Sequence, residues 1–146
     1  MTTPTSVTRT TTLRGTIYTL GSAQSDAAGQ LDRLMRDPRA CLLDVRSQPR
    51  SRRNPQWNRA ALTACYGRRY VWDRRLGNIH DRNPARGIQL AEGHQDAIRE
   101  AATLLCEGTS LVLLCACPNE RHCHRNLVAR LIQDALPVPK HGEVRA

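Results

Sequence analysis

Short apolar runs alternate with amphipathic stretches along most of the chain. The apolar and β-rich runs have the length of strands buried in a sheet, and they span 15–21, 40–45, 69–72 and 110–116. Between and after these runs, apolar residues recur at helical spacing within 25–38, 57–65, 88–108 and 126–136. This β-α-β-α-β-α-β-α order predicts a three-layer α/β domain with a mostly parallel sheet of four or slightly more strands.

Both ends of the chain lack this periodicity. We expect a disordered, threonine-rich tail at 1–13, a single α/β domain at 14–136 and a flexible tail at 137–146. No run approaches the roughly 20 apolar residues of a membrane helix, and the first residues do not have the pattern of a secretory signal. The sequence therefore predicts a cytoplasmic protein with reduced cysteines and no membrane partner.

Composition adds a strongly basic character, because the 146 residues carry a formal net charge of +9. Nine arginines and a single acid, Asp73, fall between positions 46 and 75; the arginines are 46, 50, 52, 53, 59, 68, 69, 74 and 75. The planar guanidinium group suits bidentate recognition of phosphate. We therefore expect a phosphate-bearing partner, with nucleotides, DNA and RNA as candidates. A basic surface that is merely solvated remains the alternative.

The polar clusters follow the predicted strands, at the edge where open parallel sheets bind their ligands. The residues expected to bind an anion there are Ser22, Arg46, Ser47, Arg50, Ser51, Arg53, Asn58, Gly77 and Arg125. If the sheet is parallel, Asp44 to Ser47 and Cys123 to Arg125 should converge at this edge.

The stretch CACPNERHCHR, residues 115–125, concentrates reactive side chains where the last helix begins. A helix N-terminus and nearby cations lower a thiol pKa, which favours Cys123 as a thiolate with Cys115 or Cys117 as its disulfide partner. His124 could act as a general acid or base, and Asp44 could be a base or could orient Arg46. The predicted catalytic residues are Asp44, Cys115, Cys123 and His124.

Other uses of the same stretch remain open. The free N–H groups of the helix start could bind an anion without covalent chemistry. Cys115, Cys117, Cys123 and His124, or His122, could hold zinc, although a C-x-C spacing is tighter than the usual C-x2-C pairs, so no cofactor is the first expectation. In a purely structural role, the cysteines would pack or cap the helix, and Arg125 would pair with Asp44.

Four segments, IYTLG, LLDVRSQPRSRRNPQWNRAAL, RRLGN and LLCACPNERHCHR, together resemble the domain-of-unknown-function 488 family over about residues 15–136. The resemblance implies an α/β fold and supplies no activity. The matching positions are Asp44, Arg46, Ser47, Pro49, Ser51, Asn58, Leu76, Gly77, Cys115, Cys123, His124 and Arg125. This chain departs from the family pattern at Trp57, where phenylalanine is usual, and at Cys117, where an acid is usual.

The leading hypothesis is a protein that recognises a phosphate-bearing ligand and acts on it through Cys123, His124 and Asp44. One rival is a non-catalytic nucleic-acid-binding accessory protein whose affinity comes from its arginines. A second rival is a domain stabilised by zinc.

Overall fold

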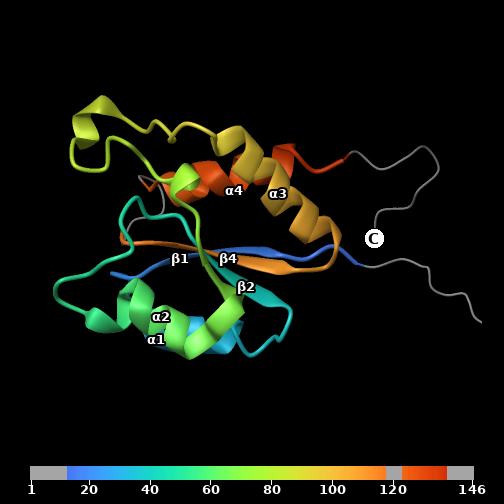
Figure 1. Ribbon diagram of the computed structural model, residues 1–146, viewed down its shortest axis with the longest axis horizontal. Helices are drawn as coiled ribbons and strands as arrows, with labels where there is room; N and C mark the ends of the chain where they lie inside the picture. Colours follow the sequence, from blue (N-terminus) through green and yellow to red (C-terminus); the bar gives the residue numbers. More distant parts are fainter. Residues whose placement is uncertain (1–12, 118–122, 138–146) are drawn as a thin grey trace, which may run out of the picture.

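A computed structural model describes residues 13–117 and 123–137. The predicted tails fall almost wholly outside these residues, as do Arg121 and His122, so the tails and the domain bounds stay predictions. Within the described part, one parallel sheet contains β1 (Ile17–Gly21), β2 (Ala40–Asp44), β3 (Tyr70–Trp72) and β4 (Ser110–Cys115), in the order β1-β4-β2-β3. The helices are α1 (Ala27–Leu34), α2 (Arg59–Tyr66), α3 (His94–Cys106) and α4 (His124–Asp134). The three-layer α/β prediction is confirmed (Figure 1).

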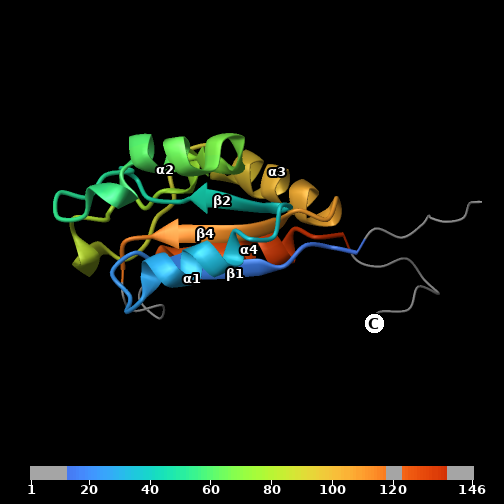
Figure 2. The ribbon, with the colours of Figure 1, turned by 90° about the horizontal axis from the view of Figure 1, so that it is seen from below.

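The helices cover both faces of the sheet. Figures 1 and 2 show α1 and α2 on one face and α3 and α4 on the other. Side chains of β4 alternate between these layers: Leu113 and Cys115 pack toward α3 and α4, while Leu114 packs toward α1 and α2. All six residues of β4 are buried, as expected for a central strand covered on both sides.

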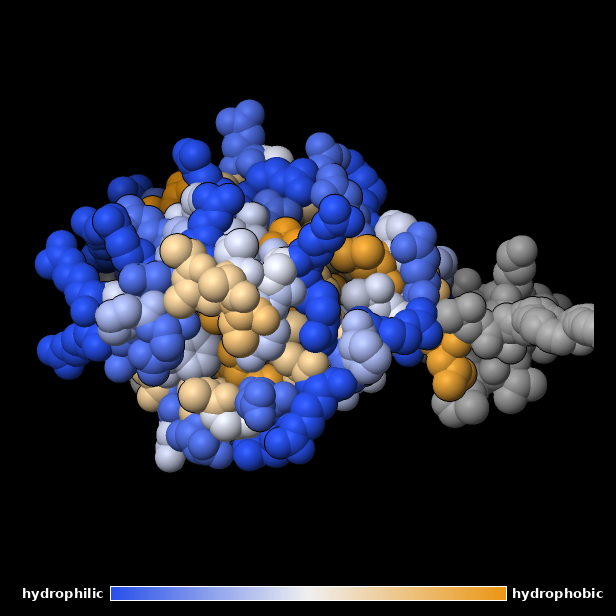
Figure 3. Space-filling model, turned by 60° about the horizontal axis from the view of Figure 1, so that its bottom comes forward, coloured by the Kyte–Doolittle hydropathy of each residue, from blue (hydrophilic) through white to orange (hydrophobic). Residues whose placement is uncertain are grey.

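The surface over α1 and α2 is mostly hydrophilic. Figure 3 views this side, where apolar side chains gather in a small groove between the two helices, lined in part by Ala28, Leu31 and Ala61. In the part of the chain that the structure describes, no helix combines the length and apolar character needed to cross a membrane.

Strand order sets the position of the site. β4 lies between β1 and β2, and the chain leaves β2 toward α2 on one face but leaves β4 toward α4 on the other. Such divergence opens a crevice between the carboxyl ends of neighbouring strands. The predicted helical stretch 88–108 becomes helical only at His94, and the residues before it form a loop that returns to Asn78 through a bridge with Leu90.

Candidate functional site

A cavity of about 740 Å³ lies at the carboxyl edge of β2 and β4. Three segments line it: Arg46, Ser47, Gln48 and Arg50 after β2; Asn78, His80, Asp81, Gly87 and Ile88 after β3; and Cys115, Ala116, Cys117 and His124 around the β4–α4 connection. Its volume is in the range of pockets that hold small organic ligands. Of the predicted site residues, Asp44, Cys123, Ser22, Ser51, Arg53, Asn58, Gly77 and Arg125 do not line this cavity.

His124 is held in one orientation by the backbone after β2. Its Nε2 lies 2.6 Å from the carbonyl oxygen of Val45. A carbonyl can only accept a hydrogen bond, so Nε2 carries the proton, and Nδ1 of the neutral ring has a free lone pair. Nδ1 faces the Cys115 Sγ at 3.7 Å. The segments Asp44 to Ser47 and Cys123 to Arg125 therefore converge as predicted, and the contact between them is the hydrogen bond from His124 to the Val45 carbonyl.

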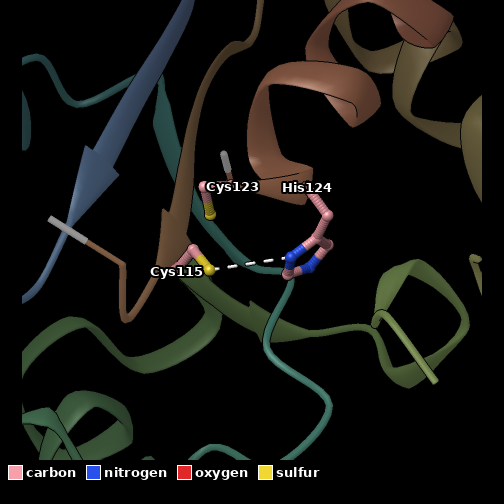
Figure 4. A group of neighbouring side chains, drawn as sticks. All are labelled: Cys115, Cys123 and His124. Atoms are coloured by element: carbon pink, nitrogen blue, oxygen red, sulfur yellow. Dashed lines mark hydrogen bonds between the residues drawn. The ribbon is translucent and has the colours of Figure 1, made fainter. Parts of the chain in front are cut away.

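The side chains of Cys115, Cys123 and His124 form one buried group. Figure 4 shows the two sulfurs and the imidazole turned toward a common centre. Their donor atoms all lie within 4.8 Å of one another, an arrangement that could hold a metal ion. The Cys117 Sγ lies 4.0 Å from the Cys115 Sγ, at the margin of this group.

The two buried thiols differ in acidity. A hydrogen bond with Cys123 lowers the pKa of the Cys115 thiol, despite the opposing effect of burial. The same hydrogen bond, together with burial, raises the pKa of Cys123 to about 11. The sequence favoured Cys123 as the thiolate; the geometry favours Cys115, which also lines the cavity.

Asp44 belongs to a different network. Its carboxylate is fully buried and accepts hydrogen bonds from Arg46 (backbone N at 3.1 Å, Nε at 2.9 Å, Nη2 at 2.7 Å) and from the Tyr70 hydroxyl at 2.6 Å. Arg46 Nη2 also donates to the Trp57 carbonyl at 2.6 Å. Tyr70 and Trp57 pack on the α1–α2 face. Asp44 therefore orients Arg46, as one of its two predicted roles, and is not brought together with the Cys/His group.

The pairing of Arg125 with Asp44, considered for a purely structural role, is wrong, because Arg46 occupies that carboxylate. Arg125 is fully buried beside β1, and its Nη1 donates to the Cys117 carbonyl at 2.9 Å. Its Nε and Nη2 have no hydrogen-bond partner within the described residues. Ser22 lies on the same side, where its backbone N–H donates to the Cys115 carbonyl at 2.7 Å.

In a comparison with protein-family models, the chain matches "Domain of unknown function DUF488" over residues 27–132. The chain belongs to the DUF488 family. No curated protein and no solved structure matches it at a significant level. The part of this DUF488 chain that matches includes every residue lining the cavity, so the site lies within the family domain.

Several predicted residues of the DUF488 chain shape the loops around the cavity. The Asn58 side chain accepts from the Ser51 backbone N–H at 2.6 Å, and the Ser51 hydroxyl accepts from Asn54 at 3.1 Å. At Gly77, a Cβ would lie 2.8 Å from the Cα of Ser47, so glycine allows the loops after β2 and β3 to touch. Arg53 is exposed.

Sequence reasoning missed His80 and Asp81, which line the cavity from the loop after β3. Asp81 accepts a hydrogen bond of 2.5 Å from the Ser47 hydroxyl, and His80 Nε2 lies 3.1 Å from the Gln89 side-chain oxygen. The available signal was their place just after the Leu-Gly pair, in a polar loop that follows a parallel strand.

Proposed function

We propose that the cavity binds a phosphate-bearing ligand, either a nucleotide or the end of a nucleic-acid strand. Cys115 and His124, here called the floor of the cavity, would act on that ligand. The observation that carries this proposal is that Cys115 and His124 line the same cavity as the exposed Arg50. Arg50 and the Cys115–His124 pair come from segments far apart in the sequence. Both line one cavity whose volume is large enough for a nucleotide.

Two features support anion binding on one side of the cavity. Arg50 is exposed and has no ion pair within the described residues, so its charge is available to a ligand. His124 is the first residue of α4, an 11-residue helix whose N-terminus carries a partial positive charge. Asp81 disfavours an anion near its own carboxylate, which could instead accept from a sugar hydroxyl or a base amine.

The floor of the cavity supplies a proton acceptor with a fixed direction. The Nδ1 of His124 can take a proton from Cys115 or from a ligand group, and the Val45 carbonyl would stabilise the imidazolium that results. Because the ring is anchored through Nε2, the acceptor stays directed at the Cys115 Sγ.

Ligand binding by matched arginine variants tests the proposal. Calorimetric titration with adenosine monophosphate should detect binding to the full chain. Arg50→Ala should weaken that binding by about tenfold or more, since a hydrogen bond to a charged group contributes about 1.5–3 kcal/mol. Arg53→Ala removes an exposed arginine that does not line the cavity, and it should change the affinity little.

The non-catalytic rival predicts a different result, and the exposed Arg52 and Arg53 favour it. A polyanion held by a diffuse basic surface would be weakened equally by Arg50→Ala and Arg53→Ala, with a steep dependence on salt. Equal effects of the two variants, or no binding of adenosine monophosphate by the unmodified chain, would contradict the cavity proposal.

A further inference from the structure

The spacing of donor atoms at the cavity floor fits a zinc ion. Zinc–sulfur and zinc–nitrogen bonds of about 2.3 and 2.0–2.1 Å place the donors of a tetrahedral site roughly 3.5–3.8 Å apart. The Cys115 Sγ and His124 Nδ1 are 3.7 Å apart, and Cys123 completes a group whose members all lie within 4.8 Å. Small side-chain adjustments would bring all three to coordination distance.

The orientation of His124 also suits a metal ligand. Histidines that bind a metal through one ring nitrogen commonly donate the other N–H to a backbone carbonyl or a carboxylate. Here Nε2–H donates to the Val45 carbonyl at 2.6 Å, which directs the Nδ1 lone pair toward the sulfurs.

No protein cation is placed to neutralise thiolates at Cys115 and Cys123 within the described residues. Arg46 is held by Asp44 in the network on the α1–α2 side, and the Arg125 guanidinium donates to the Cys117 carbonyl. Both cysteines are buried, with 4% and 2% of their surface exposed, and of the two only Cys115 lines the cavity. A bound divalent cation would supply such a charge, because metal binding releases the thiol protons.

We propose that Cys115, Cys123 and His124 form a zinc site with its fourth coordination position open to the cavity. Cys115 and His124 both line the cavity, so a ligand there can reach that position. Three protein donors with one open position are typical of catalytic zinc, which activates water or polarises a phosphoryl oxygen. This use of the metal rests on the proposed ligand of the cavity, whereas the site itself does not. With zinc bound, the Nδ1 lone pair of His124 is a metal ligand, so the zinc site replaces the proton-acceptor role of Nδ1 and keeps only the proposed ligand.

Metal titration of the full chain tests the site directly. After chelator treatment and dialysis, competition with a chromophoric chelator should show one zinc bound per chain. Cobalt substitution should give a thiolate-to-cobalt charge-transfer band and the intense visible bands of tetrahedral coordination. Absence of zinc binding, or the weak spectrum of octahedral cobalt, would overturn the proposal.

Single variants assign the donors. Cys123→Ser and His124→Gln should weaken zinc binding by more than about 100-fold, since outer-shell partners alone contribute 10–100-fold. Cys65→Ser, at an exposed cysteine of α2, should bind zinc like the unmodified chain. The Cys117→Ser variant should also bind zinc. If it does not, Cys117 is a fourth ligand, the site is closed, and the open coordination position is wrong. If a ligand variant fails to fold, the cobalt spectrum of the unmodified chain still decides.

The two proposals fail separately. If the chain binds zinc but not adenosine monophosphate, the zinc site is supported and the proposed ligand is wrong. If the chain binds adenosine monophosphate through Arg50 but takes up no zinc, the proposed ligand is supported and the zinc site is wrong.

Discussion

Asp44→Asn is expected to lower the free energy of unfolding by about 3–5 kcal/mol, the cost of removing one partner of a buried ion pair. The carboxylate accepts four hydrogen bonds and is fully buried. Asparagine would leave the Arg46 guanidinium buried without a counter-charge. Because domains are stable by only about 5–15 kcal/mol, urea denaturation should show a chain close to its folding limit.

Tyr70→Phe is the matched control for this network. It removes one hydrogen bond to the carboxylate and leaves the ion pair, so a loss of about 2 kcal/mol is expected. An Asp44→Asn chain that unfolds at the urea concentration of the unmodified protein would contradict a structural role. If instead Asp44→Asn leaves the stability unchanged but abolishes the action on the cavity ligand, the catalytic role predicted from the sequence would be supported.

Gly21→Ala is expected to cost about 3 kcal/mol, at the upper end for overpacking a close contact. A Cβ at Gly21 would lie 1.8 Å from the Cys117 carbonyl oxygen and 3.1 Å from Arg125 Nη1. That carbonyl is fixed by its hydrogen bond to Arg125, so the backbone after β4 would have to move. Because Cys117 lines the cavity, the variant should disturb the site as well as the fold.

Gly29→Ala provides the comparison within α1. The added Cβ would meet the carboxylate of Asp26, an exposed side chain that can rotate away. Alanine also favours a helix over glycine by about 1 kcal/mol. Thermal denaturation should therefore find this variant at least as stable as the unmodified chain, and an equal loss of stability from both glycine variants would contradict the account of Gly21.

The fold was predictable because the apolar runs are short, buried on both faces and separated by helical patterns. The face of the sheet on which the Asp44 side chain lies was not predictable. Side chains alternate along a strand, so the face that a residue takes depends on the register between strands, and the order β1-β4-β2-β3 is not written in any local pattern. Asp44 consequently packs with Tyr70, while Cys115 lies on the opposite face.

The chemistry of the floor was only partly predictable for a similar reason. The sequence placed Cys115, Cys123 and His124 near one another, because a short connection joins the end of the strand at Cys115 to the start of the helix at His124. It could not indicate that the Val45 carbonyl fixes the His124 ring, since a backbone contact carries no residue signature. Nor could it indicate which thiol is the more acidic, because that depends on the hydrogen bond between Cys115 and Cys123.

The central claim is that Cys115, Cys123 and His124 act as one centre at the floor of the cavity. The most direct measurement is the alkylation rate of each cysteine in the folded chain, followed by mass spectrometry with and without chelator. The exposed Cys65 should react equally in both conditions and serves as the internal control. We expect Cys115 to be protected at first and to become reactive once the chelator removes the metal. A Cys115 that reacts rapidly before chelation, or stays inert after it, would contradict the account.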